Sequence, residues 1–511
     1  MNDVSPANKW LVTASVMIPT MIEVLDTSVA NVSLTHIQGS LSAGQEEVTW
    51  VLTSYLVANA VVIPMSGWLA RVFGRKRYLL GSLILFTLSS LLCGTATSLN
   101  QLIFFRVVQG LGGGGLQPIS QAILLETFPP RERGLALAVF GMGVVVGPII
   151  GPLLGGYVTD NLSWRWIFYI NIPIGIIAFA MIVSFVFDPV YQTRRVRGET
   201  VDYMGLAFLA VGIGCLQLVL DRGQQEDWFS STSIVMLSII AAVCLIALVF
   251  WELRHKHPIL DLRILKDRSF ATGSTVMFLG FFAFFGSIVL LPLFLQRLMG
   301  YNAYLAGLVL GPGGAVTLLV LPIIGKMTQR VDARFLLGTG LLINAYSLWY
   351  MAGFNLHIDL GTAVIGRVIQ GVGMPFFFVS SSYVTMAYLR KEQMNNASAI
   401  FNLLRNLGGS FGVAFVSTLV ARRSQFHQNR LVEHINPYDP GVGIYLEHMK
   451  AGLAEKLGEF GDHTHTALNI IYGKLQREAS AMAFNDAFFA QAMIFAGLVG
   501  ILWIIRKPGK G

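Results

Sequence analysis

The chain has little charge and very little cysteine. Only 13% of its 511 residues are charged, about half the usual share of roughly 25%. A soluble protein needs a charged surface, so this composition argues against a set of soluble domains. Three cysteines in all exclude a disulfide-stapled secreted fold. What the chain has instead is apolar residues, at 54%, with a mean hydropathy of +0.63. The composition predicts a polytopic membrane protein.

Long apolar runs account for this composition. A helix needs about 20 mostly apolar residues to cross roughly 30 Å of hydrocarbon. Such runs are apolar nearly all round, which excludes amphipathic surface helices and strands with alternating faces. We expect no cleavable signal peptide, because the first run is too long and contains Glu23 and Asp26. Fourteen segments meet the test: 11–35, 48–69, 78–97, 100–125, 134–158, 166–187, 203–220, 231–252, 269–296, 302–325, 335–354, 358–388, 397–421 and 484–505.

The distribution of Lys and Arg predicts the orientation. With the N-terminus inside, the inner loops hold 23 of the 36 basic residues and the short outer loops hold three. This asymmetry predicts that both termini are cytoplasmic, in a multi-pass protein of the inner membrane. The net charge of +8 could suggest nucleic-acid binding, but basic inner loops explain it without a nucleic-acid partner.

An internal repeat predicts the domain organisation. The sequence FRVVQGLG at 105–112 returns as GRVIQGVG at 366–373, an offset of 261, and a weaker echo links Gly67 with Gly325. Duplicated halves are common in secondary transporters. We therefore expect a six-helix bundle over 1–190, a two-helix insert with basic linkers over 191–262, and a second six-helix bundle over 263–511 that includes an outer loop at 422–483.

Charges inside predicted spans need a reason, because each costs several kcal/mol there. Glu23 and Asp26 lie three residues apart on the first span, hence on one face. Arg106 lies on the fourth span at a depth similar to that of Asp26, so the two could pair. The functional interpretation is a carboxylate that binds protons, tuned by an arginine. The alternative is a static ion pair that only positions two helices. Arg367 and Arg405 are interpreted as mainly structural.

Polar residues at helical spacing predict a cavity. Gln109 and Gln117 continue the stripe of Arg106, and a face turned entirely to lipid would not hold them. Tyr55 and Asn59 form a similar pair on the second span. These four residues are candidates for lining a substrate cavity, although interhelical hydrogen bonds would explain Tyr55 and Asn59 equally well.

The fifth span has a glycine every fourth residue, a pattern that lets another backbone approach closely. Prolines within the run are expected to bend the helix. Packing alone explains the pattern, and a hinge or sliding contact would add a function. The residues concerned are Gly143, Gly147, Pro148, Gly151, Pro152 and Gly155.

Other kinds of site find little support. The glycines at 112–115 follow no strand and precede no Gly-Lys-Ser/Thr, so they are not a nucleotide loop. His463 and His465 have no third ligand nearby, so we expect no metal site, and the outer loop is interpreted as a solvated segment. The three cysteines lie in predicted spans, where they act as small hydrophobic residues.

Eight segments in order, between about residue 10 and 505, carry a family resemblance. They are VLDTSVANVSL (24–34), GWLARVFGRKR (67–77), LIFFRVVQGLGGG (102–114), GVVVGPIIGPLLGG (143–156), WRWIFYINIPIG (164–175), LPLFLQRLMGYNAYLAGLVLGPGG (291–314), NLLRNLGGSFGVAF (402–415) and QREASAMAFNDAF (476–488). With them the chain resembles the fourteen-helix drug:proton antiporters of the major facilitator superfamily, in particular the EmrB/QacA-type multidrug exporters.

The resemblance implies an all-α major facilitator fold and roles for particular residues. Asp26 and Arg106 would take part in proton coupling, and the run 143–156 would distinguish antiporters from symporters. Glu23 is not part of the common motif and ranks below Asp26. The motif between the second and third spans comprises Gly67, Gly74, Arg75 and Lys76, but Arg71 stands where the family usually has Asp. A latch based on that carboxylate therefore cannot operate here in its usual form.

The resulting expectation is a proton-coupled exporter of small hydrophobic or amphipathic drugs, working by alternating access in the bilayer. It would need no cofactor, with the proton gradient as its energy source. In a Gram-negative cell the resemblance implies a periplasmic adaptor and an outer-membrane channel, for which 422–483 is a candidate docking surface. The alternatives are an exporter of one lipid or metabolite and a non-transporting membrane sensor. An enzyme is not expected, since no nucleophile–base pair or metal cluster is visible in the spans.

Overall fold

The computed structural model describes residues 8–188, 202–255, 258–435, 440–457 and 463–504, and these form helices with no strand among them. The first half of the chain contains α1 (Lys9–Val32), α2 (Leu34–Ser40), α3 (Gln45–Val48), α4 (Trp50–Phe73), α5 (Arg75–Thr95), α6 (Leu99–Gly113), α7 (Leu116–Thr127), α8 (Arg133–Asn161), α9 (Trp166–Tyr169) and α10 (Asn171–Phe185). The remainder contains α11 (Tyr203–Arg222), α12 (Thr232–Arg254), α13 (Arg268–Leu293), α14 (Ala303–Met327), α15 (Ala333–Met351), α16 (Leu360–Met386), α17 (Met394–Val432), α18 (Pro440–Leu457) and α19 (Thr464–Val499).

Twelve helical segments in the described part of the chain are long and apolar enough to cross a membrane. The two other predicted spans fall on α6 with α7 and on α15. The sequence predicts one continuous helix over 100–125, whereas the structure divides it into α6 and α7. The division falls at Gly113, Gly114 and Gly115, because glycine is a poor helix former, and Pro118 follows in the first turn of α7.

The repeat in the sequence has a local structural basis. Ser98 caps α6 by accepting a hydrogen bond from the backbone of Gln101, and Asp359 caps α16 by accepting one from the backbone of Thr362. The two caps are 261 residues apart, the offset of the repeat itself. The helices that contain Arg106 and Arg367 therefore begin at equivalent positions.

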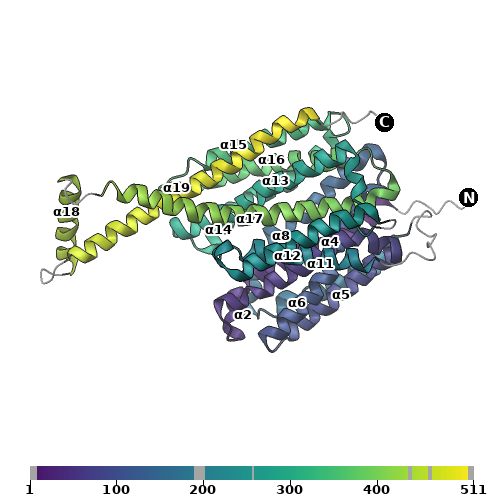
Figure 1. Cartoon of the computed structure of the whole chain (residues 1–511), viewed down its shortest axis with the longest axis horizontal. Helices are drawn as coiled ribbons and strands as arrows, with labels where there is room; N and C mark the ends of the chain where they lie inside the picture. The colour runs from purple at the N-terminus through teal and green to yellow at the C-terminus, as the bar shows by residue number, and fades with distance from the viewer. Residues whose placement is uncertain (1–7, 189–201, 256–257, 436–439, 458–462, 505–511) are drawn as a thin grey trace, which may run out of the picture.

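The described residues of 422–483 are mostly helical, whereas the sequence predicts a loop there. At about 1.5 Å per residue, the 39 residues of α17 extend roughly 58 Å, well beyond the hydrocarbon thickness of about 30 Å. Figure 1 shows α17 and α19 running side by side out of the bundle to α18. We call this projection, the described residues of 422–483, the stem.

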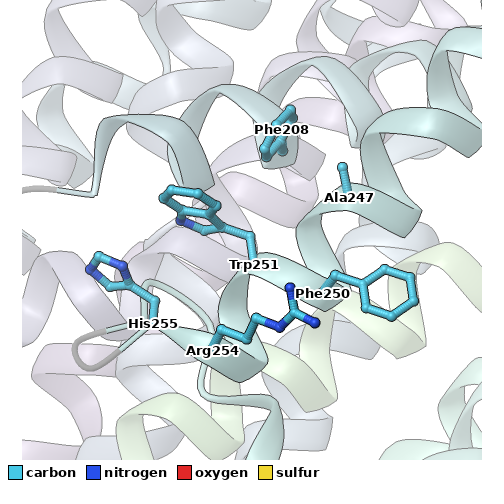
Figure 2. A pocket seen from close by; sticks show the side chains of 6 residues that line it. All are labelled: Phe208, Ala247, Phe250, Trp251, Arg254 and His255. Carbon is cyan, nitrogen blue, oxygen red and sulfur yellow. The ribbon is translucent and has the colours of Figure 1, made fainter.

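Helix α11 packs against both α4 and α17. Gln217 on α11 donates a hydrogen bond to Ser410 on α17 at 3.0 Å, and Thr53 on α4 donates one to Asp221 on α11. Helix α12 packs on α11, where a side chain at Gly212 would meet Leu245. A pocket of about 510 Å³ lies on α11 and α12; Figure 2 shows Trp251, Arg254 and the other residues that line it. None of the predicted site residues lines this pocket.

Candidate functional site

Helix α1 holds both membrane carboxylates, and the glycine run of α8 determines where α1 lies. A Cβ added at Gly147 would lie 2.5 Å from Val24, and one at Gly151 would lie 2.4 Å from the hydroxyl of Ser28. Gly143 and Gly155 likewise face α1. The predicted close approach is therefore between α8 and α1. Pro148 and Pro152 belong to α8, but their side chains lie outside what the structure describes.

Asp26 and Arg106 form a buried ion pair. Arg106 Nη1 lies 2.6 Å from Asp26 Oδ2, and their side chains are 0% and 1% exposed. The other carboxylate oxygen, Oδ1, accepts hydrogen bonds from Gln109 Nε2 at 3.0 Å and Asn171 Nδ2 at 2.7 Å. Because a buried charge is stable only when it is paired and hydrogen-bonded, these contacts explain how the Asp26–Arg106 pair is accommodated in an apolar bundle.

Arg106 is enclosed on its remaining sides. Its Nε donates to the backbone carbonyl of Val51 at 3.0 Å, and its Nη1 also donates to Gln109 Oε1 at 2.7 Å. The guanidinium stacks over the ring of Tyr55, 4.2 Å from the centroid. The Nη2 atom is buried and has no hydrogen-bond partner among the described residues. Arg106 therefore depends on Asp26 as its counter-ion.

Glu23 is the centre of a second polar cluster one turn away. Its carboxylate accepts hydrogen bonds from Tyr55 Oη at 3.3 Å, from Asn59 Nδ2 at 3.1 Å and from Gln117 Nε2. Three of the predicted cavity residues thus surround Glu23, and the fourth, Gln109, contacts Asp26. These contacts match the hydrogen-bonding alternative for Tyr55 and Asn59; no ligand is present to test the cavity interpretation.

The cluster around Glu23 joins the two halves of the chain. Arg405 Nη2 on α17 donates a hydrogen bond to Gln117 Oε1, so Gln117 bridges Arg405 and Glu23. One turn further along α7, Gln121 Oε1 accepts from Asn402 Nδ2 at 2.5 Å. From the sequence, Arg405 is interpreted as mainly structural, and no sequence pattern links it to Glu23.

The motif between α4 and α5 makes contacts of its own, separate from the Asp26 and Glu23 clusters. Gly74 adopts a positive φ of 87° at the turn, a conformation that favours glycine. Arg75 Nη1 lies 2.7 Å from Glu126 Oε2 in a buried pair, and the Lys76 amide donates to Asp188 at 2.8 Å. Gly67 packs against the first turn of α17. Arg71 Nη2 donates to the backbone carbonyl of Pro258 at 2.9 Å.

Sequence reasoning missed two members of the Asp26 site. Asn171 Nδ2 contacts Asp26 Oδ1 and also Ser90 Oγ, at 3.0 Å. Both residues are fully buried. Asn171 belongs to the segment 164–175, and an amide within an apolar run was the available signal. Ser90 offered none, because serine is common in such helices.

Within the described residues, no group of three or more His, Cys, Asp or Glu could hold a metal ion. The carboxylates of Asp26 and Glu23 can bind and release protons, and the ion pair between Asp26 and Arg106 can break and re-form.

Comparison with known proteins identifies relatives for nearly the whole chain. A model of the Major Facilitator Superfamily matches residues 16–413. The chain is 38% identical to the multidrug export protein EmrB of Haemophilus influenzae, with 98% of this chain and 96% of that protein covered. It is also 38% identical to the fatty acid resistance protein FarB of Neisseria gonorrhoeae, with 97% and 96% covered. The crystal structure of the human organic anion transporter MFSD10 (TETRAN) has a similar fold, with a TM-score of 0.62 at 13% identity over 97% of this chain and 99% of that chain.

Proposed function

The chain belongs to the major facilitator superfamily, and on this premise we propose that it exports hydrophobic and amphipathic compounds in exchange for protons by alternating access. The family is one of transporters, and the chain is a multi-pass membrane protein. The name of the relative EmrB supports export of more than one drug. The observation that matters most is the buried pair of Asp26 and Arg106.

The pair supplies a physical route from proton binding to movement. Protonation of Asp26 removes the counter-ion of Arg106, and an uncompensated buried charge costs about 3–5 kcal/mol. A rearrangement that admits water or another anion relieves this cost. Proton binding at Asp26 thus favours a different arrangement of the helices, as alternating access requires. Glu23 is the second proton-binding candidate, because its cluster spans both halves through Gln117.

We further propose fourteen spans, with α6–α7 and α15 added to the twelve that meet the length and hydropathy test. Both termini would be cytoplasmic in an inner membrane, with the domain boundaries expected from the repeat. The proton gradient would supply the energy without a cofactor. In a Gram-negative envelope the stem would project into the periplasm, where an adaptor leading to an outer-membrane channel would bind it.

Transport in proteoliposomes tests this function. A drug panel is first ranked in cells that lack their own pumps, with and without a protonophore. Purified protein is then reconstituted with an imposed pH gradient. We expect accumulation of the exported compounds that collapses with the protonophore, and substrate-linked proton movement. A protein that shows neither with any compound would not be a proton-coupled exporter.

A second candidate is an exporter of one class of lipid. The name of FarB concerns fatty acid resistance, which favours this reading over a membrane sensor. The panel therefore includes fatty acids and their neutral derivatives. Export restricted to one such class would favour the second candidate.

A further inference from the structure

The second half of the chain contains a counterpart of the Arg106 site. At the offset of 261 residues, Arg367 matches Arg106 and Gln370 matches Gln109. In each half the Nη1 atom of the arginine donates a hydrogen bond to the glutamine three residues later. The two arginines therefore occupy the same place in two equivalent helices.

The acidic partner is missing in the second half. The residue that matches Asp26 is Ser287. Its hydroxyl accepts a hydrogen bond from Gln370 Nε2 at 2.8 Å, as Asp26 Oδ1 accepts one from Gln109 at 3.0 Å. No carboxylate among the described residues pairs with Arg367, and its Nε is buried without a hydrogen-bond partner.

Among the residues that the structure describes, Arg367 also lacks a tyrosine ring like that of Tyr55, which stacks on Arg106. Gly110 packs against the carbonyl of Tyr55, and the matching Gly371 packs against the carbonyl of Gly313. Gly313 thus takes the place of Tyr55, whose ring covers Arg106 in the first half. Arg367 is partly exposed, whereas Arg106 is fully buried.

Apolar rings lie next to this open arginine. Arg367 lies 5.7 Å from the ring centroid of Phe284. Phe284 contacts Phe281 and Phe285, with centroids 5.9 and 6.0 Å apart. Phe281 in turn lies 5.8 Å from Arg405, which Gln117 already engages. A cation beside a row of rings suits a ligand with an acidic head and an apolar body.

We propose that Arg367 binds the acidic group of amphipathic anionic substrates, while the rings around Phe284 contact the apolar part. The proposal rests on the export function and names a substrate class for it. A charge within a membrane helix is expensive and marks function. A carboxylate would give the guanidinium of Arg367 the paired, charge-assisted hydrogen bonds that Asp26 gives Arg106. Gln370 and Ser287 position the guanidinium.

The test compares three fluorescent amphipaths with one apolar body and a carboxylate, a neutral amide or an ammonium head. Their binding to the purified full-length protein is measured at equilibrium. We expect the wild type to prefer the carboxylate. Arg367→Gln should weaken carboxylate binding about tenfold or more and leave amide binding nearly unchanged. Ser287→Asp should have the same effect, because it supplies the missing internal counter-ion. Arg367→Lys should retain part of the preference.

The matched control is Arg71→Gln, the same change at an arginine that donates to the carbonyl of Pro258 and lies outside both clusters; it should retain the preference for the carboxylate. Gel filtration and circular dichroism verify the fold of every variant. Equal weakening of all three ligands in Arg367→Gln, or no preference in the wild type, would overturn the proposal. Export of no compound in proteoliposomes would instead remove the export function itself, so the two failures are distinguishable.

Discussion

Arg106 and Arg367 sit at equivalent places in two equivalent helices, yet their surroundings differ. Arg106 has a carboxylate, a stacked tyrosine and a backbone carbonyl as partners. Arg367 retains the glutamine, but serine and glycine replace the carboxylate and the tyrosine. Two equivalent helices thus hold one arginine that is paired with a carboxylate, Arg106, and one that has no carboxylate partner among the described residues, Arg367.

The difference suggests a division of labour. A closed pair inside a protein responds to an event that changes the charge of one partner, such as protonation of Asp26. An open cation responds to a ligand of opposite charge. We therefore assign proton coupling to the first half and recognition of anionic substrates to the second.

The largest expected effect comes from Asp26→Asn. The amide cannot bind and release a proton, so proton-driven efflux should fall to the level seen with a protonophore. Asn can still accept hydrogen bonds from Gln109 and Asn171, so insertion into the membrane should persist. Drug accumulation in cells that lack their own pumps measures the effect, with membrane yield as the control. Retained active efflux would move the coupling to Glu23 or elsewhere.

Arg106→Lys should have the next largest effect. Lysine keeps the charge but loses the planar set of donors that reaches Asp26, Gln109 and the carbonyl of Val51. Since a hydrogen bond of a charged group contributes about 1.5–3 kcal/mol, efflux should fall about tenfold or more. Arg367→Lys should be milder, because Arg367 has fewer internal partners. Equal effects of the two changes would break the comparison between the halves.

Gly147→Ala tests how the first half holds its carboxylates. The added methyl would lie 2.5 Å from Val24, so α1 must shift, at a cost of about 1–3 kcal/mol. The melting temperature in detergent should drop and efflux should decline. Gly156→Ala on the same helix is the matched control, since no atom lies within 4 Å of an added Cβ there. Similar melting temperatures for the two variants would show that the contact between α8 and α1 is not tight.

Gln117→Ala should have the smallest effect. It removes the bridge between Glu23 and Arg405, and the loss of such hydrogen bonds should slow efflux about threefold. Gln121→Ala, which also removes a contact between the halves but spares Glu23, is the control. If efflux were as slow in Gln121→Ala as in Gln117→Ala or slower, the bridge through Gln117 would matter only for packing between the halves.

Patterns that depend on one helix at a time could be read from the sequence. Apolar runs gave the helices, and helical spacing placed Glu23 and Asp26 on one face of α1. The repeat located both arginines. Contacts between helices distant in sequence could not be read in this way: Asn171 reaches Asp26 across 145 positions, and Arg405 reaches Gln117 across 288. The difference between Arg106 and Arg367 also needed the structure, because it depends on Tyr55 and Gly313 lying against matching glycines.

The helical stem has a similar explanation. Its polar residues interrupt the apolar runs on both sides, so the sequence marks 421 as the last residue of one span and 484 as the first residue of the next. Polar residues continue a helix as readily as they form a loop, however, and α17 runs on to Val432.

The most direct test measures proton and substrate fluxes together in proteoliposomes, using the carboxylate amphipath and its neutral amide. In the wild type, both compounds should drive proton movement. Asp26→Asn should exchange both compounds down their gradients without moving protons. Arg367→Gln should slow both fluxes about tenfold or more for the carboxylate and leave both nearly unchanged for the amide. Proton movement that persists in Asp26→Asn, or that disappears with the amide in Arg367→Gln, would contradict the division of labour between the two halves.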